Sequence, residues 1–529
     1  MIETPRARRG MVTAPHHLAA QSGLAVLRDG GNAIEAAVAA AATIAVVYPH
    51  MNSIGGDGFW LIAEPGAEPV AIDACGPAAG AATPAFYRAH GHAEIPPRGG
   101  LAANTVAGTV GGWQLALEHA RAWGATLPRA RLLADAIDYA RNGIAVTASQ
   151  RRYTTAKWDE LEHQPGFRAA FAPAGAPPAT GSQLANPALA ATLERLADAG
   201  FDDFYRGDLA RALADDLARA GSPLVAADLA AYRARRVTPL KLALPWGTAW
   251  NLPPPTQGLA SLMILGIFAR LDVAEADGFA HVHGLVEATK HAFAVRDRHL
   301  ADPDVMTVDP ARCLAGVALA EAAAAIDPRR AAPWGAPTDA GDTIWLGVTD
   351  GAGRAVSFIQ SLYWEFGSGV VGAETGVLWQ NRGASFSLDP AAINVLAPGR
   401  RPRHTLNPAL ARLKDGRQLV YGTMGGDGQP QTQAALFTRY AVFGQALQAA
   451  VSAPRWLLGR SWGSPSVTLK LEARFPDRLC AALAAAGHPV ERIEAFSDLA
   501  GHAGAIARWP SGMLEGAADP RSDGAVAAY

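Results

Sequence analysis

The stretch Thr338–Tyr363, TDAGDTIWLGVTDGAGRAVSFIQSLY, decides how the rest of this chain is interpreted. Small and polar residues lead into Thr343, and after it apolar residues alternate along the chain at Ile344, Leu346 and Val348. This alternation is typical of a strand. The turn at 350–353 (DGAG) leads into a second strand with Val356, Phe358 and Ser361. The pattern predicts a β-hairpin with Thr343 at its start.

Thr343 is a candidate nucleophile because of its place at the first position of a strand. The segment before it, 331–341 (AAPWGAPTDAG), reads as flexible and open to cleavage. A threonine hydroxyl is a poor nucleophile alone, but when the residue becomes a new N-terminus its α-amine can act as the base. The residues of this stretch alone leave two interpretations open, a self-cleaving nucleophile and an ordinary hairpin threonine.

Length, charge and cysteine content exclude several classes of protein. The 529 residues are 50% hydrophobic and 18% charged, which fits a globular protein with a large core. A formal charge of −2 gives no reason to expect nucleic acid or an anionic membrane as a partner. Three scattered cysteines argue against a disulfide framework. The basic N-terminus lacks a following apolar segment, and the longest apolar run, 36–48, is too short to cross a bilayer. We therefore expect a soluble, cytoplasmic protein.

Helical periodicity recurs along most of the first 300 residues. Helices are expected at His17–Arg28, from Asn32 to near Pro49, and at Trp113–Trp123, Leu132–Arg141, Pro187–Ala199, Ala210–Ala220, Ala226–Arg233, Leu259–Leu271 and His281–Leu300. A glycine-rich loop at 52–58 precedes the expected strand Phe59–Ile62. Phosphate cradles have the order strand, loop, helix, so we expect no nucleotide site there. No linker divides the chain into independent domains.

The helix expected at His281–Leu300 carries histidines that suggest a metal site. His283 and Glu287 share a face, as do Glu287 and His291, whereas His281 and His283 point apart. No third ligand follows from the sequence, so packed or surface histidines are the better interpretation, and we expect no metal.

A second glycine-rich segment, 419–428 (LVYGTMGGDG), runs from an expected strand into an expected helix at Thr432–Ala449. Its backbone N–H groups are not shielded by side chains, which suits an oxyanion hole. A tight strand-to-helix turn is the alternative. A further strand-like segment is expected at Val377–Asn381.

Taken in order, these segments resemble the γ-glutamyltransferase family of N-terminal-nucleophile hydrolases. The resemblance runs through GGNAIEAAVA, PHMNSIGGDGF, VEATKHAFAVRDRHLADPD, the DT at 342–343, VSFIQS, FGSGV, NRGASFS, GTMGGDGQPQTQ and GAADPRSDG. It implies an αββα sandwich of two stacked antiparallel sheets between helical layers. It also implies one precursor that Thr343 cuts after Asp342, giving a large subunit 1–342 and a small subunit 343–529.

The resemblance also implies roles for individual residues. Thr343 is the nucleophile and supplies the base, Ser361 takes the place of a second hydroxyl that binds the nucleophile, and Gly425 and Gly426 fall on the pair that receives the oxyanion. No cofactor and no metal are implied.

The departures from the family pattern concern the residues that, in the family, bind the α-carboxylate and α-ammonium groups of an amino acid substrate. The loop 83–87 (TPAFY) lacks the family's arginine, and Tyr363 stands in place of an asparagine. Arg382 and Ser385 replace a glutamine and an aspartate, and His404 and Thr405 replace paired serines. Without the aspartate an ammonium has no counter-charge. Arg382 suits a carboxylate instead, with Tyr363 and His404 as further donors.

This pocket suits a small amide that bears a carboxylate and no amine. The segments NRGASFS, RHTLNPAL and YGTMGGDGQPQTQ are similar to the oxamate amidohydrolase branch, whose members hydrolyse oxamate to oxalate and ammonia in purine degradation. A γ-glutamyltransferase or glutathione hydrolase, or a glutaryl-type acylase, is the alternative enzyme, and an uncleaved binding paralogue is the alternative of a different class. The expected partners are a small-molecule amide and the two subunits of one precursor. The oligomeric state, including a homo-oligomer of the processed heterodimer, stays open.

Overall fold

The hairpin at Thr343 forms the centre of the fold in the computed structural model, which describes residues 3–335, 342–460 and 466–529. Strands β10 (Asp342–Asp350) and β11 (Ala355–Tyr363) pair antiparallel, as predicted. They lie in the middle of a seven-stranded sheet of described residues, ordered β19-β2-β10-β11-β3-β4-β7. The other strands are β2 (Gly10–Ala14), β3 (Asp57–Ala63), β4 (Val70–Ala74), β7 (Arg235–Val237) and β19 (Ala525–Ala528).

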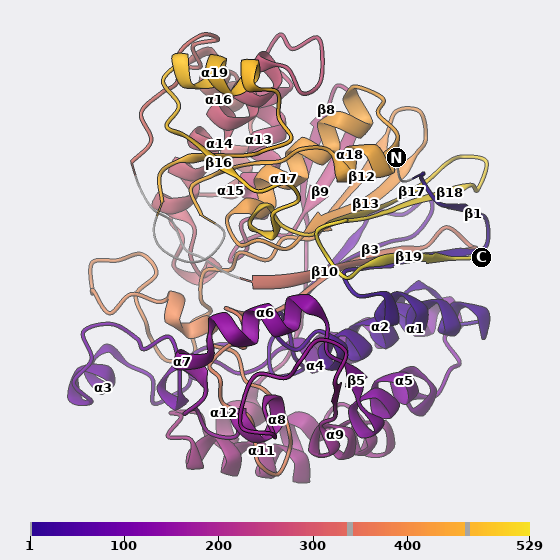
Figure 1. Cartoon of the computed structure of the whole chain (residues 1–529), viewed down its shortest axis with the longest axis vertical. Coiled ribbons are helices and arrows are strands. Elements are labelled where there is room, and N and C mark those ends of the chain that lie inside the picture. The colour runs from indigo at the N-terminus through magenta and orange to yellow at the C-terminus, as the bar shows by residue number, and fades with distance from the viewer. Residues whose placement is uncertain (1–2, 336–341, 461–465) are drawn as a thin grey trace.

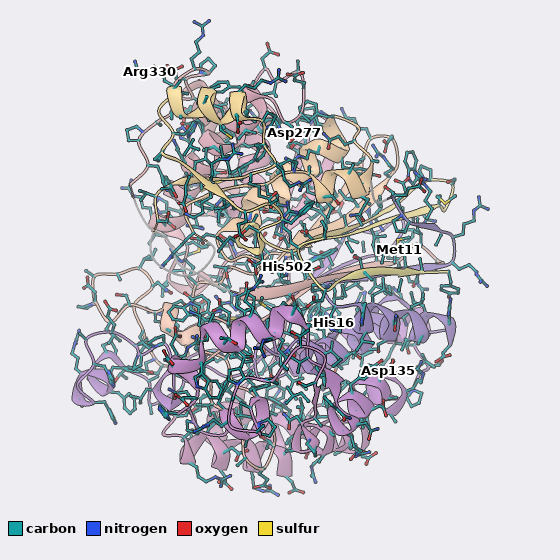
Figure 2. All side chains as sticks on the ribbon, in the orientation of Figure 1. Met11, His16, Asp135, Asp277, Arg330 and His502 are labelled. Carbon is teal, nitrogen blue, oxygen red and sulfur yellow. The ribbon has the colours of Figure 1, made fainter. Side chains whose placement is uncertain are left out.

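A second antiparallel sheet lies against the first (Figure 1). Its order within the described chain is β1-β18-β17-β13-β12-β9-β8. The strands are β1 (Arg6–Ala7), β8 (Leu240–Leu244), β9 (Gly247–Asn251), β12 (Ala409–Leu413), β13 (Gln418–Thr423), β17 (Ala503–Arg508) and β18 (Leu514–Ala518). Side chains of both sheets share one apolar cluster, which includes Met11, labelled in Figure 2, and Trp345.

Alternation along β10 divides its side chains between two cores. Ile344, Leu346 and Val348 join the cluster under the first helical layer, whereas Trp345 enters the cluster between the sheets. The facing strand has Gly422 at this point, where a Cβ would lie 2.2 Å from the Trp345 ring. The absent side chain leaves room for the indole, so the two sheets can approach closely.

Helices cover the outer face of each sheet (Figure 1). The β10 sheet is covered by α1 (His17–Arg28), α2 (Ala33–Val47), α4 (Thr109–Ala120), α5 (Arg129–Asn142) and α9 (Pro187–Ala199). The β13 sheet is covered by α13 (Gly258–Phe268), α14 (Phe279–His299), α17 (Gly428–Phe437), the π-helix η5 (Thr438–Val442) and α18 (Leu447–Ser452). The four layers confirm the αββα prediction.

The remaining elements are shorter helices and two small sheets of described residues. They are α3 (Pro84–Ala89), η1 (Gly100–Ala102), η2 (Arg121–Trp123), β5 (Ile144–Ala145), α6 (Ala148–Ala156), α7 (Trp158–Leu161), α8 (Phe167–Phe171), β6 (Gln183–Leu184), α10 (Asp203–Arg206), α11 (Asp208–Arg219), α12 (Ala226–Ala231), η3 (Pro303–Val305), α15 (Pro310–Cys313), α16 (Gly316–Ala324), η4 (Arg382–Ser385), β14 (Trp456–Leu458), β15 (Leu469–Glu472), α19 (Asp477–Ala485), β16 (Val490–Ile493) and η6 (Asp498–Ala500). Among the described residues, no helix combines the length and hydrophobicity needed to cross a bilayer.

Two predicted elements differ from the structure. The segment Val377–Asn381 joins no sheet and makes only isolated bridges, Val371 to Leu378 and Gly55 to Trp379, within the described chain. The helix expected at Thr432–Ala449 is divided into α17, η5 and α18. Apolar periodicity is continuous through this region, but a π-helical turn and the short loop before α18 interrupt the α-helix.

Candidate active site

Thr343 is completely buried at the start of β10, where the hairpin has an irregular register. Asp342 pairs with Tyr363 and Ile344 pairs with Gln360, so Ser361 and Leu362 together lie opposite Thr343. Such a bulge turns side chains out of the regular alternation. The Thr343 hydroxyl accepts a long hydrogen bond of 3.5 Å from Gln429 Nε2 at the start of α17. Residues 336–341, just before the predicted cleavage site, lie outside the described chain, as does the Asp342 side chain.

Ser361 and Tyr363 lie at the open end of the hairpin, opposite Asp342 and Thr343, and a hydrogen bond joins them. The Tyr363 N–H donates to Ser361 Oγ at 2.8 Å, and Tyr363 has a φ of 86°. A positive φ is unfavourable for an aromatic residue, and such strain concentrates at functional sites. Gly56 lies against this turn, where a Cβ would be 2.1 Å from the Ser361 carbonyl oxygen. The glycine loop at 52–58 therefore packs directly against the hairpin.

Arg382 lies over the Tyr363 ring, with its guanidinium carbon 4.1 Å from the ring centroid. It begins η4, is 1% exposed, and its Nη1 donates to Thr405 Oγ1 at 3.4 Å. The contact with the ring face stabilises the cation. Because Tyr363 pairs with Asp342, this buried positive charge lies at the same end of the hairpin as Thr343. Ser385, also in η4, donates to the Arg403 carbonyl at 3.5 Å.

Asp57 supplies a buried carboxylate beside Arg382. Its Oδ1 accepts from the N–H groups of Gly76 (3.0 Å) and Gly108 (3.2 Å) and from Gln380 Nε2 (3.1 Å). Burial raises the pKa of Asp57 to about 7, against the opposing effects of the Gly76 hydrogen bond and the Arg382 charge. A group with this pKa changes its charge near neutral pH.

His404 is directed at Asp57. Its Nε2 lies 3.1 Å from Asp57 Oδ2, and its Nδ1 lies 3.5 Å from the Leu406 N–H. Burial, and then the charge of Arg382, hold the pKa of His404 well below its usual value, so the ring is neutral. Both ring nitrogens contact the protein. In this structure the Nε2 contact holds the Asp57 carboxylate, and a role of His404 as a donor to a substrate stays a prediction.

The glycine loop between β13 and α17 holds Gly425 and Gly426, the pair that the family resemblance assigns to the oxyanion. Gly425 and Gly426 have φ values of 116° and 50°, which favour glycine. The Gly425 carbonyl accepts from the Gly428 N–H at 2.7 Å, and the Met424 carbonyl accepts from Thr423 Oγ1 at 2.7 Å. Across a trans peptide the next N–H points the opposite way. The N–H groups of Gly425 and Gly426 therefore point away from these partners.

The loop is supported from both sides. The Met424 N–H donates to the carbonyl of His502 at 3.3 Å, a residue labelled in Figure 2 near the centre of the molecule. On the other side, Arg296 Nη1 lies 2.7 Å from Asp427 Oδ1, and both side chains are buried. Asn407 Nδ2 donates to Gln429 Oε1 at 3.1 Å, which turns the Gln429 amide nitrogen toward Thr343.

Two buried groups in the described chain have the composition of metal sites, Asp57 with Cys75 and His404, and His283 with Glu287 and His488. In the first, Asp57 already accepts several hydrogen bonds and the Arg382 cation is close. In the second, the sequence had indicated no third ligand, and the structure brings His488 to it from the loop after α19. However, His283 Nδ1 lies 2.9 Å from His488 Nε2, and Lys290 Nζ lies 2.7 Å from Glu287 Oε1. These contacts favour packed side chains over ligands.

Sequence reasoning did not identify Asp57, Gln429 or Arg296. All three lie within the motifs that carry the family resemblance, so the motifs contained a signal. The order of glycine loop and strand at 52–58 argues only against a phosphate site and assigns no role to Asp57. Nothing in the sequence places Asp57 beside His404, because 347 positions separate them.

Comparisons with known proteins place the whole chain in one family. The model of the family described as "Gamma-glutamyltranspeptidase" matches residues 19–529. The "Oxamate amidohydrolase proenzyme" of Klebsiella pneumoniae subsp. pneumoniae is 59% identical over 98% of both chains. The "Glutathione hydrolase-like YwrD proenzyme" of Bacillus subtilis is 39% identical over 98% of both chains. The crystal structure of cephalosporin acylase from Bacillus halodurans has a TM-score of 0.92 and 34% identity, covering 100% of this chain and 97% of that one.

Proposed function

We propose that this chain, which belongs to the gamma-glutamyltranspeptidase family, is a self-processed amidohydrolase with an N-terminal threonine nucleophile. Two relatives with full-length coverage are named proenzymes, which supports processing of a precursor. The proposed subunits are residues 1–342 and 343–529. Thr343 Oγ attacks the carbonyl carbon of Asp342, the acyl group moves from nitrogen to oxygen, and water hydrolyses the ester. The products are a carboxylate at Asp342 and a free α-amine at Thr343.

In turnover the new α-amine takes the proton of Thr343 Oγ as the oxygen attacks the substrate amide carbon. An α-amine has a pKa of ~7.7–8.0 before perturbation, which suits a general base near neutral pH. The N–H groups of Gly425 and Gly426 stabilise the oxyanion, and Ser361 orients the nucleophile. The intermediate releases ammonia, and water then hydrolyses the acyl-Thr343 ester to free the acid.

The substrate we propose is oxamate, which is hydrolysed to oxalate and ammonia. The observation that carries this proposal is the buried Arg382 guanidinium, held over Tyr363 and bonded to Thr405. A planar guanidinium matches a carboxylate bidentately. The carboxylate of Asp57 is engaged by two backbone N–H groups, Gln380 and His404, and so does not suit a substrate ammonium. Ser385 and Thr405 complete the proposed substrate pocket.

Ammonia release from purified, processed protein tests this proposal. We expect kcat/KM for oxamate to exceed that for glutathione and for glutaryl amides. Faster release of glutamate from glutathione than of ammonia from oxamate would support the alternative, a γ-glutamyltransferase or glutathione hydrolase. That alternative has some support in the name of the Bacillus subtilis relative.

A denaturing gel distinguishes the proposed processed enzyme from the alternative interpretation, an uncleaved binding paralogue. The processed enzyme gives two bands, whereas a single band near 55.0 kDa that does not change with time would refute processing. A role in purine degradation and a cytoplasmic location stay predictions from the sequence.

A further inference from the structure

Gln257 joins the two sides of the proposed substrate pocket through one side-chain amide. It lies before α13, is 1% exposed, and belongs to the segment proposed as the large subunit. Its Nε2 donates to the Thr405 carbonyl at 2.7 Å and to the Gly426 carbonyl at 2.8 Å. Thr405 binds Arg382, and Gly426 belongs to the oxyanion loop. The two carbonyl oxygens are therefore at most about 5.5 Å apart, the sum of the two bond lengths.

The orientation of this amide is determined by a buried ion pair. Arg296 Nη1 donates to Gln257 Oε1 at 2.9 Å and to Asp427 Oδ1 at 2.7 Å. An arginine offers only donors, so it must face the amide oxygen, and the amide nitrogen must face the two carbonyls. A flipped amide would place its NH₂ against the guanidinium and its oxygen against two carbonyl oxygens. The charge pattern thus allows a single arrangement.

The backbone of the same residue binds only one side of the pocket. The Gln257 N–H donates to the His404 carbonyl at 2.9 Å, and the His404 N–H donates to the Pro255 carbonyl at 2.8 Å. A changed side chain at 257 leaves these backbone bonds in place. It removes the hydrogen bond that ties the Gly426 carbonyl to the segment carrying Thr405.

We propose that Gln257 is a positioning residue that sets the spacing between the carboxylate anchor, Arg382 with Thr405, and the oxyanion loop at Gly425 and Gly426. This inference rests on the proposed function and deepens it by naming the substrate length that the site selects. The selected class is amides whose carboxylate carbon is bonded directly to the reacting carbonyl carbon, about 1.5 Å away. Longer acids such as succinamate, with two more carbons, hold their two ends further apart, so we expect the site to discriminate against them.

The test compares oxamate with succinamate in Gln257→Asn and Gln257→Met. Asparagine is shorter by one C–C bond, about 1.5 Å, so its amide reaches one carbonyl but not both. Misplacement of reacting groups by 1 Å can cost about 100-fold in rate. We expect kcat for oxamate to fall by about that factor with a smaller change in KM, and the ratio of kcat/KM values, oxamate over succinamate, to fall about tenfold.

Gln448→Met is the matched control. Gln448 is also a buried glutamine whose amide holds backbone, with Nε2 2.8 Å from the Ala518 carbonyl, and it contacts neither side of the pocket. We expect the wild-type ratio from this control. Parallel losses on both substrates in the Gln257 variants, variants that stay uncut on a denaturing gel, or an equal shift of the ratio in Gln448→Met would each overturn the proposal.

Failure of the proposed function gives a different result. If wild-type enzyme releases no ammonia from oxamate, the substrate assignment is refuted whatever the variants do. If wild type hydrolyses oxamate and the Gln257 variants keep its substrate ratio, the positioning role alone is refuted.

Discussion

The two sides of the pocket are built in different ways. On the side proposed for the chemistry, Thr343 and Ser361 lie on paired strands, and Gly425 and Gly426 present backbone groups. On the side proposed for substrate recognition, Arg382, Asp57 and His404 are buried side chains that hold one another by charge and hydrogen bonds. A backbone-built site tolerates changes in neighbouring side chains, whereas a side-chain-built site changes with a few substitutions. Relatives named for different substrates are consistent with this division.

The sharpest way to test the chemical side is Thr343→Ala. Loss of the hydroxyl removes both the processing step and the acyl intermediate, so the chain should stay as one band and activity should fall at least about 10⁴-fold. Thr343→Ser, which keeps the hydroxyl, is the control and should still be processed. Cleavage of the alanine variant at 342–343 would show that another residue is the nucleophile.

On the recognition side, Arg382→Ala should leave processing intact and raise KM for oxamate by about 100-fold. Truncating one partner of a buried charge contact typically costs about 2–5 kcal/mol. Steady-state ammonia release measures KM and kcat separately. An unchanged KM would remove Arg382 as the carboxylate anchor, and a loss of processing would mean that the two sides are not separable.

Ionisation of Asp57 should have a smaller effect on KM for oxamate. Because its pKa is raised to about 7, Asp57 is largely neutral below that pH and ionised above it. The ionised form places a negative charge near Arg382 and competes with an anionic substrate. KM for oxamate should therefore rise about tenfold between about pH 6 and about pH 8.

Asp57→Asn removes this titration and is the comparison for the pH series. The variant should show a flatter KM profile, while the dependence of kcat on the Thr343 amine persists. His404 and Cys75 also contact or face Asp57, but their pKa values are shifted away from this range, His404 downward and Cys75 upward. An equal slope in wild type and variant would assign the pH dependence to another group.

Metal removal is expected to have the smallest effect on stability and activity. The groups Asp57–Cys75–His404 and His283–Glu287–His488 already form hydrogen bonds and ion pairs within the protein. Treatment with EDTA, followed by addition of Zn²⁺, should leave Tm and kcat/KM unchanged. A rise in Tm with Zn²⁺ that Glu287→Gln abolishes would establish the second group as a metal site.

The sequence determined much of the local structure. Helix α1 has the predicted bounds, and α2 begins after the Asn32 cap, where the side chain bonds the N–H groups of Ile34 and Glu35. The hairpin follows from alternation and its turn. These features depend on neighbours within a few residues, so local patterns suffice to predict them. The helix at 432–449 was less accurate, because periodicity does not reveal a π-helical turn.

Parts of the candidate site could be predicted from the sequence, whereas others depend on the tertiary structure. Motif order was enough to propose Thr343, Ser361, Arg382 and the glycine pair, although their catalytic roles stay predictions. The tertiary structure alone decided that Asp57 meets His404 and that Gln257 meets Thr405 and Gly426. These contacts join positions more than 140 residues apart. A buried polar group needs partners wherever the fold can supply them, and one chain's sequence does not record which distant segments the packing brings together.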